Sequence, residues 1–325
     1  MANLKTTYAG LSLRNPLIVS SSGLTDSVDK IIKIADEGAG GVVLKSLFEE
    51  QIKFEAGKFI DSTDYPGADE YLNYYIRNNN VDHYLELIEG AKARAGIPVI
   101  ASINCISNTE WVDFAKKIEE AGADALELNV YFIPLSKEDS CQTYEKIYLD
   151  LASRMKELIK IPVIMKLSNY FTNLVNLVNQ LYFRGVSAVV LFNRFYSPDI
   201  QLDDRKLVPS EVFSNPADIR DPLRWTAILS HFVDKIQLGA STGVHDGRAV
   251  IKLLLAGAHA VHVCSALYLN GTGYIKTILK DVEEWIDKSN YSGIDDFRGK
   301  MNYGNISDPV SYERSQFMKY YSSHH

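Results

Sequence analysis

The chain has 325 residues, enough for one large domain such as an α/β barrel of roughly 250 residues. Its composition, 46% hydrophobic and 23% charged, is that of an ordinary soluble globular protein. A formal net charge of -7, with no basic block to offset it, argues against a nucleic-acid or anionic-membrane partner. The sequence shows no membrane span, no secretory signal and only three widely spaced cysteines, so we expect a cytoplasmic protein without disulfides or zinc.

A glycine that ends a helix and leads into a short apolar strand recurs four times. These glycines, which should adopt a left-handed backbone, are Gly38, Gly122, Gly185 and Gly257. Between the strands that follow them lie four more apolar segments without alternation, as expected of strands covered on both faces, at 16–20, 97–103, 161–166 and 235–239. Helices are predicted in the gaps, at 27–37, 81–94, 108–121, 143–159, 171–183 and 222–233, and before Gly257, with Asn108 and Asp246 as N-terminal caps.

This alternation predicts a single domain over residues 1–325, with the fold of an eightfold β/α (TIM) barrel. The alternative is a doubly wound open sheet, which would need a Gly-x-Gly-x-x-Gly turn after the first strand, and Ser20–Gly23 does not supply it. An extra helix over 274–288 should close on the barrel, followed by a tyrosine-rich, partly mobile tail at about 301–325.

Three long loops, at 47–80, 130–142 and 194–221, follow the second, fourth and sixth strands. They therefore lie at the C-terminal face, where barrel enzymes build their active sites, and they predict a lid over a small-molecule substrate. The seventh and eighth strands end in small residues, including Thr242, Gly243, Cys264 and Ser265. Small residues there let backbone N–H groups approach an anion, so this stretch predicts a phosphate site, although an ordinary tight turn explains it equally well.

The other strand ends carry a convergent polar set: Ser21, Ser22, Gly23, Lys45, Ser46, Asn104, Glu127, Asn129, Lys166 and Asn193. The sequence offers no Ser-His-Asp set, suitable carboxylate pair or metal-ligand cluster, and we expect His259 and His262 to serve packing. A buried, unpaired lysine is costly, which favours functional roles for Lys45 and Lys166. Lysines, amides and hydroxyls suit an enzyme whose chemistry comes from a cofactor, and flavin mononucleotide (FMN) would use all three.

Several short motifs in register resemble the dihydroorotate dehydrogenase family, and most closely its soluble class 1 branch. They are Asn15–Gly23, Val43–Ser46, Glu127–Asn129, Met165–Leu167 and Ser292–Phe297, spread over nearly the whole chain. The resemblance implies oxidation of dihydroorotate to orotate in pyrimidine biosynthesis, by an FMN-binding barrel that is usually a homodimer. It implies that FMN is held by Ser21, Ser22, Lys45, Ser46, Asn129, Lys166, Thr242, Gly243, Cys264 and Ser265, to which the strand-end pattern adds Gly23 and Asn104. Asn129 and Asn193 would contact the substrate.

The substrate half departs from the family pattern. Where the family has Asn-x-Ser-Cys-Pro-Asn, with cysteine as the base, this chain has Asn129-Val-Tyr-Phe-Ile-Pro134, which places Phe132 at the base position. Loss of a general base typically costs about 100- to 10,000-fold in rate. Tyr131 is the candidate replacement, with Cys105 and Cys141 as weaker alternatives.

Further departures affect the surrounding loops. Asp61 stands near a family asparagine, Arg194 replaces a serine, and Phe213–Pro216 replaces a glycine-rich loop. Three hypotheses follow: a dihydroorotate dehydrogenase with Lys45 and Tyr131 as catalytic residues; an FMN enzyme for another small substrate, whose carboxylate Arg194 would bind; and a catalytically silent flavin-binding partner. A phosphosugar barrel without flavin is a fourth.

Overall fold

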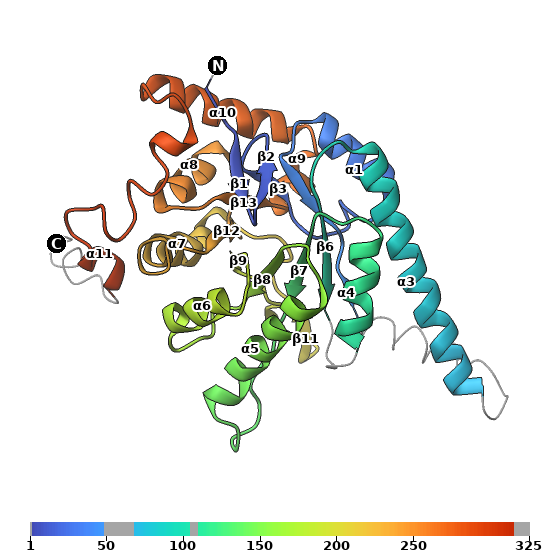
Figure 1. Cartoon of the computed structure of the whole chain (residues 1–325). Helices are drawn as coiled ribbons and strands as arrows, with labels where there is room; N and C mark the ends of the chain where they lie inside the picture. The colour runs from blue at the N-terminus through green and yellow to red at the C-terminus, as the bar shows by residue number, and fades with distance from the viewer. Residues whose placement is uncertain (1, 49–67, 105–109, 315–325) are drawn as a thin grey trace.

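The computed structural model describes residues 2–48, 68–104 and 110–314 (Figure 1). Asp61, Cys105 and Asn108 lie outside the described residues, as do most of the loop at 47–80 and the end of the C-terminal tail.

Within the described residues, eight parallel strands form a closed barrel in chain order. They are β3 (Leu17–Val19), β4 (Gly41–Val43), β6 (Val99–Asn104), β7 (Ala125–Asn129), β8 (Val163–Leu167), β9 (Ala188–Leu191), β12 (Gln237–Ser241) and β13 (Ala260–Val263). The ring closes where β13 pairs with β3, and β4 pairs directly with β6, which also carries the short β5 (Leu47–Phe48). The predicted barrel is confirmed, and the open-sheet alternative is wrong.

Helices surround the barrel (Figure 1). In chain order they are α1 (Val28–Asp36), α3 (Ala68–Arg94), α4 (Glu110–Glu120), α5 (Cys141–Leu158), α6 (Leu174–Phe183), α7 (Arg220–Phe232) and α8 (Gly247–Ala256). The prediction for α3 was wrong, because the helix begins at Ala68 and not at Val81. The run of three asparagines at 78–80 has low helix propensity and resembles a break, but the helix continues through it.

The strands lack alternation because both of their faces are buried. One apolar cluster lies between strands and helices, and a second fills the inside of the barrel. The inner cluster includes one residue from each of five strands: Ile18, Val43, Ile100, Ala125 and Ile164. Because alternate residues of a strand face the same side, the residues two positions later also point inward. A buried polar layer lies there, above the apolar one, at Ser20, Ser102, Glu127, Lys166 and His262, whereas Lys45, at the corresponding position beyond β4, is exposed.

A short N-terminal hairpin, not anticipated from the sequence, closes the lower end of the barrel. It consists of β1 (Thr6–Tyr8) and β2 (Leu11–Leu13), joined by Ala9 and Gly10 with φ of 50° and 78°. Positive φ at both central residues is the geometry of a type I′ hairpin turn. Tyr8 is fully buried and belongs to the inner cluster, so the hairpin acts as the floor of the barrel.

The four repeated glycines behave as predicted. Gly38, Gly122, Gly185 and Gly257 have φ of 106°, 88°, 86° and 116°, the left-handed region that ends a helix without steric cost. Asp246 also caps α8, accepting a hydrogen bond of 2.8 Å from the backbone N–H of Ala249.

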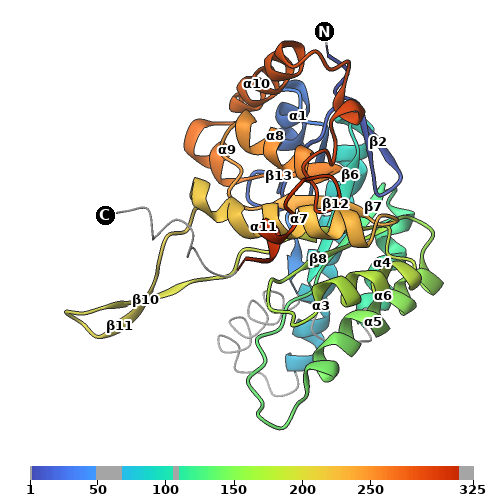
Figure 2. The same ribbon diagram turned by 90° about the vertical axis from the view of Figure 1, so that its left-hand side faces the viewer.

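The segment predicted as a long loop at 194–221 is more ordered than expected. It contains an antiparallel hairpin of β10 (Pro198–Gln201) and β11 (Lys206–Pro209), then η1 (Pro216–Ile219) and the start of α7. Figure 2 shows the hairpin projecting away from the barrel. Its strands are exposed except for the half-buried Val208, so they lack the buried apolar run by which the barrel strands were predicted. By contrast, residues 130–140 form a loop as predicted.

After the barrel the chain forms α9 (Ser265–Asn270) and α10 (Tyr274–Lys288), the latter with the predicted bounds. Then come η2 (Ile294–Asp296) and α11 (Val310–Glu313). The first part of the tail is docked, since backbone N–H groups of Met301 and Tyr303 donate to carbonyls of α8 and α7. Among the described residues, no helix has the length and apolarity to span a membrane.

Candidate active site

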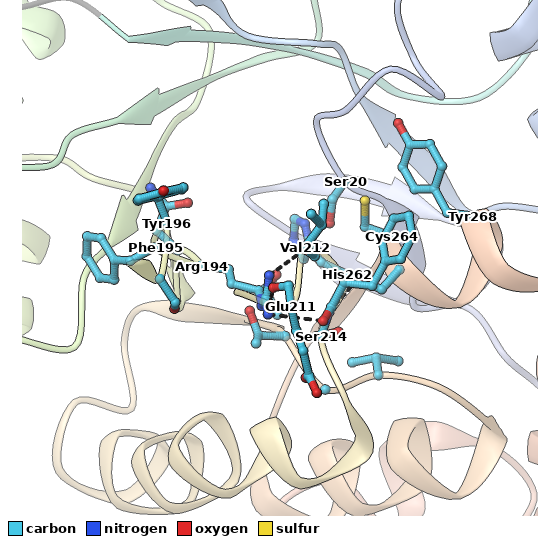
Figure 3. Close-up of a pocket in the computed structure, with 18 of the residues that line it drawn as sticks. Ser20, Arg194, Phe195, Tyr196, Glu211, Val212, Ser214, His262, Cys264 and Tyr268 are labelled. Atoms are coloured by element: carbon cyan, nitrogen blue, oxygen red, sulfur yellow. Dashed lines mark hydrogen bonds between the residues drawn. The ribbon is translucent and has the colours of Figure 1, made fainter. Parts of the chain in front are cut away.

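A cavity of about 610 Å³ opens at the C-terminal mouth of the barrel (Figure 3). This volume lies in the usual range for small-molecule and cofactor sites, roughly 300–1,000 Å³. Its walls include the ends of β3, β8, β12 and β13 and residues from the segment that carries the hairpin. The structure brings eight of the predicted residues together here: Ser21, Lys166, Asn193, Arg194, Thr242, Gly243, Cys264 and Ser265.

The other predicted residues do not line this cavity. Ser46 lies behind Ser21, with the two hydroxyl oxygens 3.0 Å apart, and Asn129 lies behind Asn193. Gly23 stands close to Tyr268, whose hydroxyl would be 2.9 Å from a Cβ placed on that glycine. Ser22 contacts Cys264, and Asn104 ends β6, while Lys45 and Tyr131 are exposed.

The two small-residue strand ends lie side by side, as the sequence predicted. Gly243 has φ of 74°, and a Cβ there would lie 2.1 Å from the backbone nitrogen of Ile219. Only glycine therefore fits, and the chain passes very close to η1. Ser265 Oγ accepts a hydrogen bond of 3.0 Å from the backbone N–H of Ser214, whose own hydroxyl is 3.1 Å from His245 Nε2. This set of small side chains and main-chain groups forms one wall of the cavity.

Lys166 is the buried cation of the cavity. Lys166 is only 8% exposed, and its charge interacts with the buried carboxyl group of Glu127, although the two form no close ion pair in the described part of the chain. An unpaired buried ammonium is costly unless a ligand supplies an anionic or electron-rich partner. The expectation of burial is wrong for Lys45, because β4 ends at Val43 and Lys45 is exposed beyond it. The buried-ammonium argument therefore applies to Lys166 alone.

Lys166 also sets the electrostatics of its neighbours. Burial lowers the pKa of His262 to about 3, and the Lys166 charge acts in the same direction, so His262 is neutral at physiological pH. Burial raises the pKa of the Cys264 thiol, with a Ser22 hydrogen bond and Lys166 opposing the rise. Cys264 is thus held as a thiol and is not a candidate nucleophile.

Two amides and one guanidinium lie next to the small-residue wall, because β9, which leads into Asn193 and Arg194, pairs with β12. Asn193 Nδ2 donates to Asn129 Oδ1 over 2.6 Å, which fixes both amide orientations. Arg194 lines the cavity, but its guanidinium donates to the backbone carbonyls of residues 211–213 (Figure 3). Asp218 lies 3.9 Å from Arg194 Nε. The structure thus shows Arg194 holding the segment 211–213 over the cavity, rather than presenting free donors to a ligand carboxylate.

The loop that departs from the family motif forms an aromatic wall. Tyr131 and Tyr170 both contact the ring of Phe195, at centroid distances of 4.7 and 4.9 Å. Phe132 turns the other way and packs against Tyr148, with centroids 6.3 Å apart. Its side chain therefore serves packing, whereas Tyr131 is 36% exposed. Cys141 is exposed at the start of α5.

Sequence reasoning missed several residues of the site. His262 is buried against Tyr8, as the packing role predicts, but it also lines the cavity. Its position two residues before Cys264 puts both side chains on the same face of the chain, and this spacing could have identified His262 as a cavity residue. Ser214, Glu211 and Tyr268 also line the cavity. They come from a segment and a short helix whose positions no periodic pattern fixes. No group of three or more His, Cys, Asp or Glu side chains in the described part of the chain is arranged to hold a metal ion.

Comparison with known proteins agrees with this geometry. The family model of dihydroorotate dehydrogenase matches residues 3–286. Relatives named dihydroorotate dehydrogenase B (NAD(+)), catalytic subunit, include that of Thermoplasma acidophilum, 28% identical over 92% of this chain and 99% of the relative. Those of Thermococcus kodakarensis and Methanocaldococcus jannaschii are 28% and 26% identical, over 92% and 88% of this chain and 98% and 94% of their own lengths.

The family match covers most of the barrel, including every strand end that lines the cavity. The chain belongs to the dihydroorotate dehydrogenase family.

Proposed function

We propose that this protein binds FMN and oxidises dihydroorotate to orotate, the step of pyrimidine biosynthesis for which its relatives are named. The observation that carries the proposal is the buried Lys166, which lies in a cavity between a wall of small residues and the Asn129–Asn193 amide pair.

The residues present fit a phosphorylated planar cofactor. Small residues and close main-chain approach at Thr242, Gly243 and Ser265 suit a phosphate, and Lys166 suits an electron-rich ring edge. When bound, FMN would supply the two-electron chemistry that removes hydrogen from the CH–CH bond. The protein would hold and orient both molecules and exclude water from the space between them.

In this proposal each side of the cavity has its own task. The Lys166 ammonium would stabilise negative charge on the reduced cofactor, with the exposed Lys45 as a second cation at the rim. Asn193, fixed by its hydrogen bond to Asn129, would donate to the substrate. Arg194 would keep the segment 211–213 in place over it. Tyr131 would take the proton that leaves dihydroorotate, since Phe132 cannot accept one.

The test is an anaerobic titration of the purified protein with L-dihydroorotate, followed in the visible flavin band. Bleaching of the band supports the proposal. A yellow protein whose band dihydroorotate leaves unchanged would show that the cofactor is kept and that the substrate is different. In that case Phe132→Cys, which restores the family residue, should allow dihydroorotate to bleach the flavin band of the variant but not that of the wild type.

We also propose that the chain is a homodimer located in the cytoplasm. The β10–β11 hairpin supports self-association, because it carries apolar side chains that are 60%, 83% and 73% exposed at Ile200, Leu202 and Leu207. The relatives' designation as a catalytic subunit adds the proposal that a separate subunit takes up the electrons. Light scattering after gel filtration should give twice the chain mass, and Leu202→Asp should shift it toward the monomer. A wild-type mass equal to one chain would exclude the dimer.

A further inference from the structure

A row of hydroxyl groups leads from the cavity into the barrel. Ser21, Ser46 and Ser102 lie on neighbouring strand segments, and their hydroxyl oxygens are 3.0 Å apart between Ser21 and Ser46 and 2.7 Å between Ser46 and Ser102. The row ends on Glu127, whose Oε1 lies 3.4 Å from Ser102 Oγ. Ser21 lines the cavity, so these four residues, the serine row and its carboxyl end, join the site to the interior.

The hydrogen bonds of the row have one consistent direction. Ser102 donates its only hydroxyl proton to Glu127, so its oxygen must accept from Ser46, and the Ser46 oxygen must in turn accept from Ser21. Ser21 Oγ also accepts from the backbone N–H of Ser46 over 2.8 Å, which leaves its hydrogen free to point along the row. A proton that enters at Ser21 can therefore pass from hydroxyl to hydroxyl toward the carboxylate.

The row is held rigidly by the packing of α3 against β6. Tyr84, itself buried, donates to the carbonyl oxygen of Ser102 over 3.0 Å and accepts from the Ser102 N–H over 2.7 Å. Ser46 and Ser102 are 5% and 0% exposed, so bulk water does not break the row. These contacts explain the geometry of Ser102 but give no structural reason for a carboxyl group at its end.

Burying the carboxyl group of Glu127 in the barrel interior costs free energy. Glu127 is 1% exposed, and its Oε2 atom has no hydrogen-bond partner. The titratable groups that face it are Lys166 from β8, Tyr8 from the floor hairpin and Tyr84 from α3, with neutral His262 beyond Lys166. Burial raises the pKa of Glu127, and the Lys166 charge lowers it. A second negative group close to Lys166 would weaken this lowering, so the protonation state of Glu127 depends on the charge of a ligand bound beside Lys166.

We propose that Glu127 stores a proton for the reaction and that Ser102, Ser46 and Ser21 relay it between the cavity and the barrel interior. This inference rests on the proposed function, because the negative charge that draws Lys166 away from Glu127 arrives with the electrons on the reduced cofactor. One proton enters from solvent in the cavity, each serine accepts one and passes one on, and the Glu127 carboxylate becomes a carboxylic acid. Reoxidation returns the proton by the same row, with no other bond made or broken.

The first test measures the protons bound when the cofactor is reduced. The midpoint potential of the bound flavin is followed against pH by spectroelectrochemistry in the wild type and in Glu127→Gln, with Glu157→Gln, an exposed glutamate on α5, as control. In the wild type and the control, we expect the slope of midpoint potential against pH to change within the measured range by the amount that corresponds to one proton per flavin. Glu127→Gln should lose that change. Equal slopes in all three proteins would overturn the proposal.

The second test separates storage from relay. Ser102→Ala leaves Glu127 in place, so the slope change should remain, but proton uptake measured with a pH indicator in stopped flow should slow about 10-fold or more. Ser187→Ala, at the opposite end of the barrel, is the matched control. Uptake by Ser102→Ala at the wild-type rate would exclude the row as the route.

A third measurement remains valid if Glu127→Gln does not fold. Infrared difference spectra of wild-type protein with isotope-labelled glutamate should show a carboxylic acid band that appears on flavin reduction. Its absence would overturn the proposal, whereas a protein that binds no flavin would contradict the proposed function instead.

Discussion

The two sides of the cavity are built in different ways. On the side that we propose to hold the cofactor, short strand ends place buried residues such as Lys166 and Gly243, with little room for change. On the substrate side, long segments carry exposed aromatic residues, and Arg194 holds one of them by its main chain. The first side depends on barrel geometry that few residues can satisfy, and the second on contacts that tolerate replacement. The departures from the family motif lie on the second side, as this difference predicts.

The largest expected effect concerns Tyr131, on the adaptable side. Tyr131→Phe removes the hydroxyl that we propose as the base and keeps the ring contact with Phe195, so flavin reduction by dihydroorotate should slow about 100-fold or more. Rapid-mixing absorbance measures this rate. Tyr170→Phe, whose ring contacts the same Phe195, is the control and should stay near the wild-type rate. Equal rates in both variants would exclude Tyr131 as the base.

On the rigid side, Gly243→Ala should abolish tight cofactor binding. The added Cβ would lie 2.1 Å from a backbone atom of Ile219 at a φ of 74°, so the wall must shift. We expect a loss of FMN affinity of about 100-fold, or about 2.7 kcal/mol, in a fluorescence titration. Gly10→Ala has a similar φ of 78° but open space around it, and it should leave the affinity unchanged. An unaltered affinity of Gly243→Ala would contradict the rigid-wall picture.

The buried layer beneath the cofactor side predicts acid sensitivity. The pKa of His262 is about 3 in the folded protein and near 6.5 when unfolded, so below pH 6.5 the unfolded state binds more protons. The free energy of unfolding should therefore fall as pH is lowered, by about 2 kcal/mol from this residue alone between pH 7 and pH 5. Denaturant titrations at both pH values measure it. His262→Gln should reduce the loss, whereas His83→Gln, at an exposed site on α3, should not.

The smallest effect is expected for Arg194. Arg194→Met removes the hydrogen bonds to the carbonyls of residues 211–213, so KM for dihydroorotate should rise about 10-fold while kcat changes little. Steady-state kinetics separate the two constants. Arg205→Met, on the exposed hairpin, is the control. A fall in kcat with KM unchanged would instead place Arg194 in the chemical step.

The sequence by itself determined the barrel and the strand ends that meet in its cavity, because both depend on local signals. Gly38, Gly122, Gly185 and Gly257 mark helix ends whatever the rest of the chain does, and apolar strands covered on both faces need no partner to be recognised. Once the barrel is given, the strand ends must meet at one face, so Lys166, Thr242, Gly243 and Cys264 could be placed together in advance.

The tertiary structure alone decided what depends on contacts between distant segments. The floor hairpin is placed by the packing of Tyr8 into the inner cluster, and Lys45 is exposed although its neighbours Leu44 and Ser46, also beyond the end of β4, are buried. The guanidinium of Arg194 donates to carbonyls of residues 211–213, and the serine row becomes continuous only when segments of four neighbouring strands are brought within hydrogen-bond distance. Periodicity gives the face on which a side chain lies, but hydrogen-bond partners are fixed by distances that only the closed barrel sets.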